Sequence, residues 1–314
     1  MVNLLILLII LLIIIYYINY KLISINGKLI LDNGKRIDNG KLILDNGKLI
    51  LDNGKRIDNG KRIDNGKRID NGNIINLKIL TYNIQRLPYH FRDNPIFLNR
   101  VDADIICLQE YFLNIVRWRY DFLQKLDYNI CIPPKNNKLK WDSGLVILSK
   151  YPIKYVDYCP FINSSCVDRL VEKGFMVVKI KDLYVINTHL QASYMNSLNY
   201  EIIMDQLKQI QNYIKTNNLN KKNCLLVGDF NYNLQDIIWN DIDNFKIIKS
   251  NQETNWDNFK FSTKFKEYET QEGLYCDGGF LWSNSYSVEN IQTITEDKYT
   301  DHLGVKFLLQ KNST

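Results

Sequence analysis

Short apolar runs that end in polar residues recur through residues 74–314. Each run has the length and the β-branched or aromatic content of a buried strand. The runs are NLKILTYNI, ADIICLQE, GLVILSK, FMVVKIK, LYVINTHL and NCLLVGDFN. Between them, Leu113–Leu126 and Met195–Lys215 carry apolar residues at helical spacing. This alternation predicts one mixed α/β domain with a substantial core over residues 74–314.

The N-terminus has a different pattern. Leu4–Ile18 is fifteen apolar residues without interruption, and Met1–Tyr20 as a helix would span roughly 30 Å, about one bilayer core. We therefore expect residues 1–20 to be a single-pass transmembrane anchor. A cleaved signal peptide is the alternative, although it normally has a basic start and a small-residue cleavage site. Lys21 follows the span and no basic residue precedes it, which favours a cytoplasmic catalytic domain; a cleaved signal would make the domain secreted.

Residues 21–73 form a linker dominated by a repeat. From residue 28 the units KLILDNG and KRIDNG follow one another seven times. Asp-Asn-Gly is a strong turn signal, and so few residues between turns can bury little core. We expect irregular turns or a disordered spacer. A stacked array of β-turns, or a basic contact with anionic lipid, is the alternative.

The charge distribution and the cysteine spacing argue against strong nucleic-acid binding and against a zinc site. The net charge is +6, but residues 74–314 hold 28 basic against 27 acidic residues. The predicted domain thus lacks the basic surface of a strong nucleic-acid binder. Six cysteines show no CxxC spacing for zinc. Cys107 and Cys224 are predicted to be buried apolar side chains, and Cys159 could pair with Cys166 if the domain is secreted.

Polar residues at the ends of the predicted strands are the candidate chemistry. Two of the three histidines of the chain belong to this set of carboxylates, amides and imidazoles. Its members are Asn83, Glu110, His189, Asp229, Asn231, Asp277, Asp301 and His302. Together they suit metal-assisted hydrolysis of a phosphate ester. Taken singly, each has a structural interpretation: a solvated strand edge, a turn in Gly-Asp-Phe-Asn, or a helix cap at Asp-His.

The order of five motifs along the chain favours a catalytic role for these residues over the structural interpretations. TYNIQ, LQE, NTHL, GDFN and TDHLGV occur along residues 74–314 in the order that resembles the endonuclease/exonuclease/phosphatase superfamily, which includes DNase I. The resemblance implies a DNase I-like α/β (α+β) fold. In this four-layer α/β/β/α sandwich, two stacked sheets are flanked by helices and the motif loops meet at one end.

Three further motifs resemble the neutral and bacterial sphingomyelinases. They are SGLVILSKYPI, KGFMVVKI and THLQAS. The resemblance implies a phosphodiesterase that converts sphingomyelin to ceramide and phosphocholine at a phospholipid membrane. The alternatives are an endonuclease that cleaves DNA or RNA with the same residues, and a catalytically inactive membrane-anchored scaffold. The oligomeric state stays open.

The resemblance also assigns roles around a metal ion. Glu110 is expected to bind Mg²⁺, or Mn²⁺ or another divalent cation, with Asn83 as a neighbouring ligand or phosphate contact. Hard oxygen donors of this kind suit Mg²⁺. His302 is expected to be the general base that activates water, and Asp277 to orient it.

The remaining roles concern the phosphate. His189 is expected to donate a hydrogen bond or proton to it, and Asp229 and Asn231 to position the water and a phosphoryl oxygen. Asp301 is expected to support the metal or His302.

Two segments depart from the family pattern. Gly278-Gly279-Phe280 follows Asp277, where the family has an aromatic residue and then an apolar strand, and two glycines make the backbone there more permissive. Asn244–Gly273 matches no motif and carries aromatic residues among lysines. It is expected to pack into the core, and the alternative is a segment that enters a membrane.

Overall fold

The computed structural model describes residues 76–87, 95–113, 117–192, 199–250, 275–295, 300 and 302–312, and two short strands near the N-terminus. These strands, β1 (Ile43–Asp45) and β2 (Lys48–Ile50), pair antiparallel within the repeat. The predicted anchor 1–20 and the rest of the linker 21–73 lie outside the described residues. Among the helices of the described part, none is long and apolar enough to cross a membrane.

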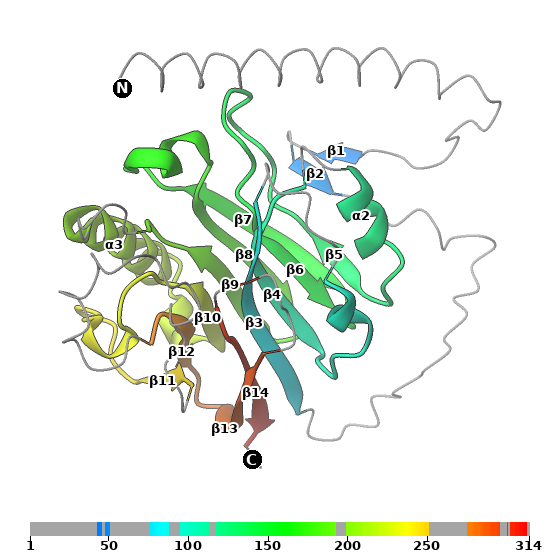
Figure 1. Ribbon diagram of the computed structural model, residues 1–314. Helices are drawn as coiled ribbons and strands as arrows, with labels where there is room; N and C mark the ends of the chain where they lie inside the picture. Colours follow the sequence, from blue (N-terminus) through cyan, green and yellow to red (C-terminus); the bar gives the residue numbers. More distant parts are fainter. Residues whose placement is uncertain are drawn as a thin grey trace, which may run out of the picture. The chain divides into compact units, whose positions relative to one another are not determined.

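Two mixed six-stranded sheets make up the domain (Figure 1). The first, in spatial order, consists of β13 (Tyr286–Ile294), β14 (Gly304–Lys311), β3 (Leu77–Arg86), β4 (Ile105–Tyr111), β6 (Val146–Ser149) and β5 (Asn129–Cys131). The second consists of β11 (Phe245–Lys249), β12 (Asp277–Trp282), β10 (Cys224–Asp229), β9 (Leu183–His189), β8 (Gly174–Ile180) and β7 (Ile153–Pro160). Each sheet has one parallel pair, β3 with β4 and β9 with β10.

Apolar residues of both sheets meet in one core. Ile79 and Cys107 of the first sheet pack in the same buried cluster as Val185 and Val227 of the second. Because strand side chains alternate between faces, each sheet also has a second apolar face to cover. The two stacked sheets agree with the predicted sandwich.

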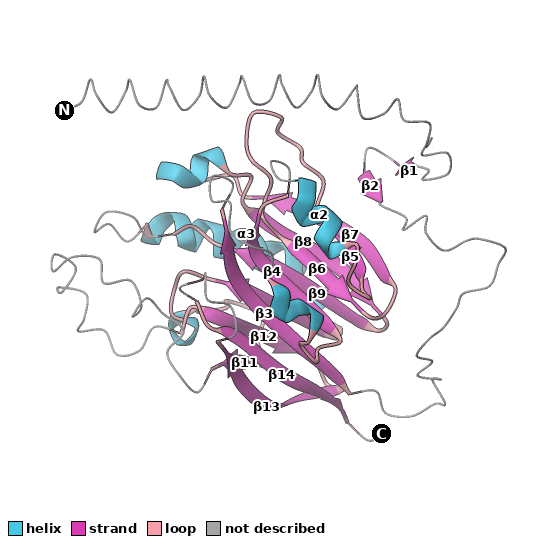
Figure 2. Cartoon of the chain, turned by 45° about the vertical axis from the view of Figure 1, so that its right-hand side comes forward, coloured by secondary structure: helices cyan, strands magenta, loops and turns pink. Residues whose placement is uncertain are grey.

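Helices cover those outer faces (Figure 2). α3 (Tyr200–Thr216) packs Ile203, Ile210 and Ile214 against the second sheet. The short α2 (Arg117–Leu123) and the 3₁₀ turn η1 (Ile96–Asn99) lie on the first. The remaining 3₁₀ turns are η2 (Cys166–Leu170), η3 (Leu219–Lys221) and η4 (Leu234–Asp236). Both predicted helices exist, each shorter than its apolar periodicity indicated.

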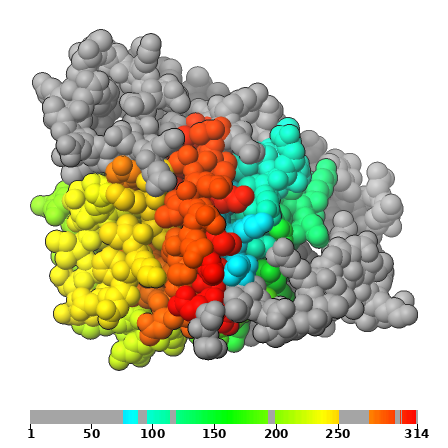
Figure 3. Space-filling view, turned by 90° about the horizontal axis from the view of Figure 1, so that it is seen from below, coloured from blue at the N-terminus to red at the C-terminus, as the bar shows by residue number. Residues whose placement is uncertain are grey.

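The strand directions bring the polar motifs to one end of the domain. β3, β4, β9 and β10 all terminate there, and β12 starts there because it runs antiparallel to β10 with Asp277 opposite Asp229. Figure 3 shows the molecule of Figure 1 from below. In this view the orange and red residues of β13 and β14 lie between the yellow residues near β11 and the cyan start of β3.

The two glycines after Asp277 have a packing reason. β12 is hydrogen-bonded on both sides, by β10 and β11. A Cβ atom at Gly278 would lie 2.2 Å from the Ile248 carbonyl oxygen, and one at Gly279 would lie 2.0 Å from that of Leu226. Only glycine fits such close backbone approach. The departure from the family pattern therefore serves this tight strand and leaves Asp277 in register with Asp229.

The cysteines are all free thiols, so the alternative disulfide between Cys159 and Cys166 is not formed. Cys107 and Cys224 are buried, as predicted. Of the stretch 244–273, residues 251–273 lie outside the described part, and Phe245 packs edge-on against Phe280.

Candidate active site

Asn83 connects two carboxylates of the site. Its buried amide nitrogen donates hydrogen bonds to Glu110 Oε1 at 3.0 Å and to Asp229 Oδ2 at 2.9 Å. Its Oδ1 accepts one from the backbone N–H of Gln85 at 3.1 Å. Glu110 belongs to the first sheet and Asp229 to the second, so one amide holds carboxylates from both sheets together.

Glu110 is the half-buried carboxylate at the rim. It is in β4 with a left-handed backbone, φ +55°, a conformation that strains a non-glycine residue and clusters at functional sites. Burial raises its pKa to about 7, against the opposing effects of the Asn83 hydrogen bond and the nearby His302. A carboxylate in this setting is stabilised by any cation that binds beside it.

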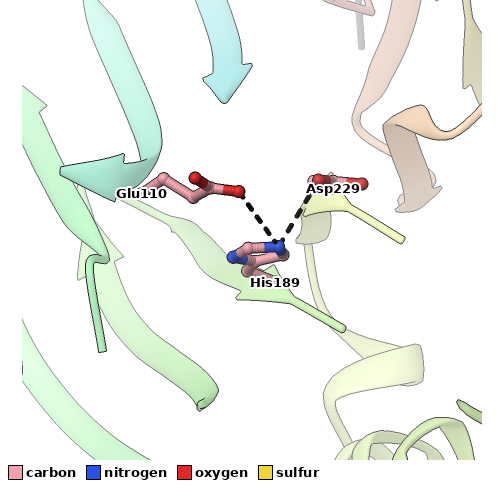
Figure 4. Close-up of side chains that lie close together, drawn as sticks. All are labelled: Glu110, His189 and Asp229. Atoms are coloured by element: carbon pink, nitrogen blue, oxygen red, sulfur yellow. Dashed lines mark ion pairs between the residues drawn. The ribbon is translucent and has the colours of Figure 1, made fainter. Parts of the chain in front are cut away.

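His189 faces both carboxylates from the end of β9 (Figure 4). Its Nε2 lies 3.8 Å from Glu110 Oε1 and 3.5 Å from Asp229 Oδ2. Burial, with the Lys173 ammonium 3.1 Å from Nε2, lowers the pKa of His189 to about 3, so the imidazole is neutral at physiological pH. Within the described part of the chain, its buried Nδ1 has no hydrogen-bond partner.

Asp229 is the ionised carboxylate at the centre. Burial alone would raise its pKa, but His302, His189, the Asn83 amide and the backbone N–H of Asn231 together hold it below its ordinary value. That N–H donates to Asp229 Oδ1 at 2.9 Å. The side chain of Asn231 donates to the Leu190 carbonyl oxygen at 3.1 Å, which fixes the turn after β10.

His302 pairs with Asp277. Its Nδ1 lies 2.9 Å from Asp277 Oδ2, and its Nε2 lies 3.7 Å from Asp229 Oδ2. Because an ionised carboxylate only accepts, the Nδ1 atom carries the proton and Nε2 is left as an acceptor. Thr300 anchors the segment: its hydroxyl donates to the Asn83 carbonyl oxygen at 2.6 Å and accepts from the His302 N–H at 3.1 Å.

The structure thus brings seven of the eight candidate residues together: Asn83, Glu110, His189, Asp229, Asn231, Asp277 and His302. Asp301 lies outside the described residues.

The sequence alone did not identify Lys173, a buried lysine, as part of the site. The Lys173 ammonium makes an ion pair with Asp168 at 2.8 Å, and it donates a hydrogen bond to the Leu190 carbonyl oxygen at 2.7 Å. Buried charges are kept only when they are paired. KGFMVVKI carries a signal, because Lys173 stands directly before an apolar strand, but the motif by itself assigns no chemical role to this lysine.

The sequence alone also did not predict the buried hydrogen bonds that connect the two sheets. Gln109 Nε2 donates to Asn187 Oδ1 at 2.7 Å, and Asn187 Nδ2 donates to the Leu108 carbonyl oxygen at 2.9 Å and that of Val146 at 3.2 Å. Both side chains are fully buried. They stand one and two residues before Glu110 and His189, so the bridge sets the spacing between the sheets directly beneath the site.

The donor set fits a divalent cation. Ligand atoms of Glu110, His189 and Asp229 lie within 4.8 Å of one another, and so do those of Asp229, Asp277 and His302. Three carboxylates and two amides from the ends of four strands are hard oxygen donors of the kind that Mg²⁺ or Mn²⁺ prefers. Burial raises the pKa of Glu110 because it disfavours the charged carboxylate, and a cation bound beside it would offset that cost.

Comparison with protein families identifies one match. The model described as "Endonuclease/Exonuclease/phosphatase family" covers residues 80–263, which include Asn83, Glu110, His189, Asp229 and Asn231.

Comparison with individual proteins agrees. Sphingomyelinase C of Bacillus cereus is 28% identical over an alignment of 190 residues, and the match covers 50% of this chain and 57% of that protein. Among solved structures, sphingomyelinase C of Streptomyces griseocarneus has a TM-score of 0.55 at 18% identity and covers 76% of this chain and 100% of its own. A mutant β toxin of Staphylococcus aureus with bound magnesium ions has a TM-score of 0.55 at 18% identity, covering 74% and 99%. At such identities the two structures establish the fold.

Proposed function

Because the chain belongs to the endonuclease/exonuclease/phosphatase family, we propose that it hydrolyses a phosphodiester with the help of a divalent cation. One observation carries this proposal: carboxylates and imidazoles from both sheets converge within 4.8 Å at one end of the domain. Such a cluster of ionisable groups costs folding free energy, and catalysis is the usual reason for one.

The metal site is assigned to the rim. Glu110 would hold Mg²⁺, with Asn83 as a further ligand or a contact to the phosphate. When bound there, the cation supplies positive charge that polarises a phosphoryl oxygen and stabilises the leaving alkoxide. Mn²⁺ or another divalent cation is compatible with the same oxygen donors.

His302 is assigned as the general base. With the proton on Nδ1, its Nε2 can accept a proton from water, and Asp277 at 2.9 Å fixes the ring and stabilises the imidazolium that forms. Asp229, 3.7 Å from Nε2, stabilises the same positive charge. Asp301 would support His302 or the metal.

The phosphate is assigned to the other half of the site. Asn231 would contact a phosphoryl oxygen, and Asp229 would position the attacking water. His189 is neutral in the free protein, and its Nε2 accepts a hydrogen bond from Lys173. A bound phosphate dianion or monoanion raises the pKa of a neighbouring imidazole, and His189 would then donate to the phosphoryl oxygen.

Sphingomyelin is the substrate that the comparisons support best, with ceramide and phosphocholine as products. The matched curated proteins include sphingomyelinase C of Bacillus cereus, and SGLVILSKYPI, KGFMVVKI and THLQAS resemble that group. The match spans little more than half of that relative's length, so the substrate is part of the proposal.

The test gives the full chain, purified in detergent with Mg²⁺, sphingomyelin vesicles in one tube and plasmid DNA in another. Phosphocholine release with intact DNA, lost on adding EDTA, is the expected result. His302→Ala serves as the negative control. Nicked DNA with untouched lipid would leave the residue roles in place and move the substrate to nucleic acid. A zero rate on both, and on a soluble aryl phosphodiester, would show an inactive scaffold.

A further inference from the structure

Two loops flank the site and are joined along their length. We call residues 133–143 and 161–172 the paired loops. The Trp141 N–H donates to the Leu170 carbonyl oxygen at 2.7 Å, and the Glu172 N–H donates to that of Trp141 at 3.1 Å. Both Glu172 carboxylate oxygens accept backbone N–H groups, from Asn136 and Asn137, at 2.9 Å. The two loops therefore form one fixed surface.

The paired loops end at the catalytic centre. Lys173, the next residue, lies 3.1 Å from His189, and a hollow of about 190 Å³ between the loops reaches the same lysine. Figure 1 shows both loops in green beyond the upper ends of β6, β7 and β8, with η2 in the second loop. A substrate that approaches the site along this side meets the loops first.

The paired loops expose four large apolar side chains. Leu139 is 96% exposed, Ile162 83%, Leu170 54% and Val167 47%. Single exposed apolar side chains are ordinary on protein surfaces. Four of them, half of the large exposed hydrophobic residues that the described part contains, are concentrated on two loops beside one site. Such a concentration marks an interaction surface.

The acidic and the basic side chains of the paired loops differ in solvent exposure. The acidic residues Asp142, Asp168 and Glu172 are buried and accept hydrogen bonds from within the protein. The basic residues Lys135, Lys138 and Arg169 are exposed. The outward face is therefore apolar and positively charged. This combination suits the interface of a phospholipid bilayer, where apolar side chains enter the acyl boundary and cations meet phosphate groups.

We propose that the paired loops are a membrane-docking surface, with Leu139, Ile162, Val167 and Leu170 inserted into the bilayer interface and Lys135, Lys138 and Arg169 on the lipid phosphates. The partner is a bilayer carrying anionic lipid. This inference rests on the proposed lipid substrate: docking here would set the mouth of the site against the membrane, so that a head group need not leave the interface before it is hydrolysed.

Native Cys166 provides the test. It is the exposed thiol of the described part and stands beside Val167, while Cys131 and Cys159 are half-buried and the others are buried. The full chain is labelled there with an environment-sensitive fluorophore and added to vesicles of neutral or anionic phospholipid. The control label stands on Ile238→Cys in a Cys166→Ser background, because Ile238 is 79% exposed and lies outside the paired loops. Residues 4–18 could carry any variant to a vesicle, so the emission shift of the label, not sedimentation, is the readout.

We expect a blue shift at Cys166 that is larger on anionic vesicles, and none at residue 238. Leu139→Ser with Ile162→Ser should weaken the vesicle titration by about a hundredfold, because burial of each side chain corresponds to roughly a factor of ten. Both side chains are exposed, so the fold and the hydrolysis of a soluble aryl phosphodiester stay unchanged. Equal shifts at both positions, or a shift only with an added protein extract, would overturn the proposal.

The two proposals fail separately. A Cys166 shift without phosphocholine release keeps the docking surface and removes sphingomyelin as the substrate. Phosphocholine release without a Cys166 shift keeps the enzyme and removes the docking surface.

Discussion

At the residue scale, the pair His302–Asp277 has the role that a single substitution tests most directly. His302→Ala should lower kcat by at least about a hundredfold, because positioned general bases contribute factors of that size. Asp277→Ala should lower it too, and the double variant should lose little more than His302→Ala, since the two side chains act as one unit. Steady-state kinetics on a soluble phosphodiester measure all three, with circular dichroism to verify the fold. Near-normal turnover of His302→Ala would remove it from the role of base.

Glu110 gives a pH-dependent prediction. Its pKa in the metal-free fold is about 7 against an ordinary value of 4.5. A carboxyl whose pKa is raised on folding stabilises the fold below its unfolded pKa, and this contribution is lost as the pH rises through the folded pKa. In EDTA, Glu110→Gln should therefore be more stable than the wild type at pH 8, by on the order of 2 kcal/mol, and not at pH 4.

Thermal melts at the two pH values measure this difference. Glu201→Gln, at an exposed position on α3, is the matched control and should show no such pattern. Saturating Mg²⁺ should stabilise the wild type at pH 8 and much less the Glu110→Gln variant, because binding to the native state raises stability. A stability difference that is the same at both pH values would contradict the assigned pKa.

At the element scale, the bridge between the sheets depends on Asn187. Its side chain pairs with Gln109 and with two carbonyl oxygens of the facing sheet. Asn187→Ala removes all three of these buried hydrogen bonds between the sheets and should cost about 3 kcal/mol of unfolding free energy. The neighbouring Thr188→Val removes a single hydrogen bond, to the Gly174 carbonyl oxygen within one sheet, and should cost about 1 kcal/mol. Urea unfolding compares the two; equal losses would show that the bridge does not couple the sheets.

Six strands, β3, β4, β6, β8, β9 and β10, were predictable because each is a short apolar run, and the runs of β3, β4, β9 and β10 lead into functional motifs. Asn83, Glu110, His189 and Asp229 could be placed at strand ends for that reason. Helix ends were less predictable, because apolar periodicity extends beyond the helix into residues that pack in a loop. α3 begins at Tyr200, five residues after the predicted start at Met195.

Residues that depend on tertiary pairing were not predictable from local patterns. Lys173 contacts His189 only because the start of β8 lies beside the end of β9, and Asn187 bridges the sheets only because the sheets stack. Gly278 and Gly279 looked like a defect in the motif, although β10 and β11 require them. In each case the deciding atom belongs to a strand distant in sequence.

At the scale of the whole molecule, residues 74–314 are predicted to be an independent catalytic domain. β3, its first strand, begins at Leu77 and lies inside the first sheet. A chain that starts at residue 74 should therefore fold, with the same melting behaviour as the full chain in the presence of Mg²⁺, and should hydrolyse a soluble phosphodiester at the same rate. A chain that starts after β3, at residue 88, is the control and should not fold. Loss of activity in the first chain would show that residues 1–73 contribute to the site.

The pairing of β3 with β14 also fixes when the protein can first act in a cell. A ribosome makes Asn83, Glu110, His189 and Asp229 early, but His302 emerges only with β14, the last strand of the sheet. Until then β3 has an unfilled edge and the nascent chain lacks its base. On the proposed residue roles, hydrolysis therefore cannot begin before β14 has been synthesised and has paired with β3.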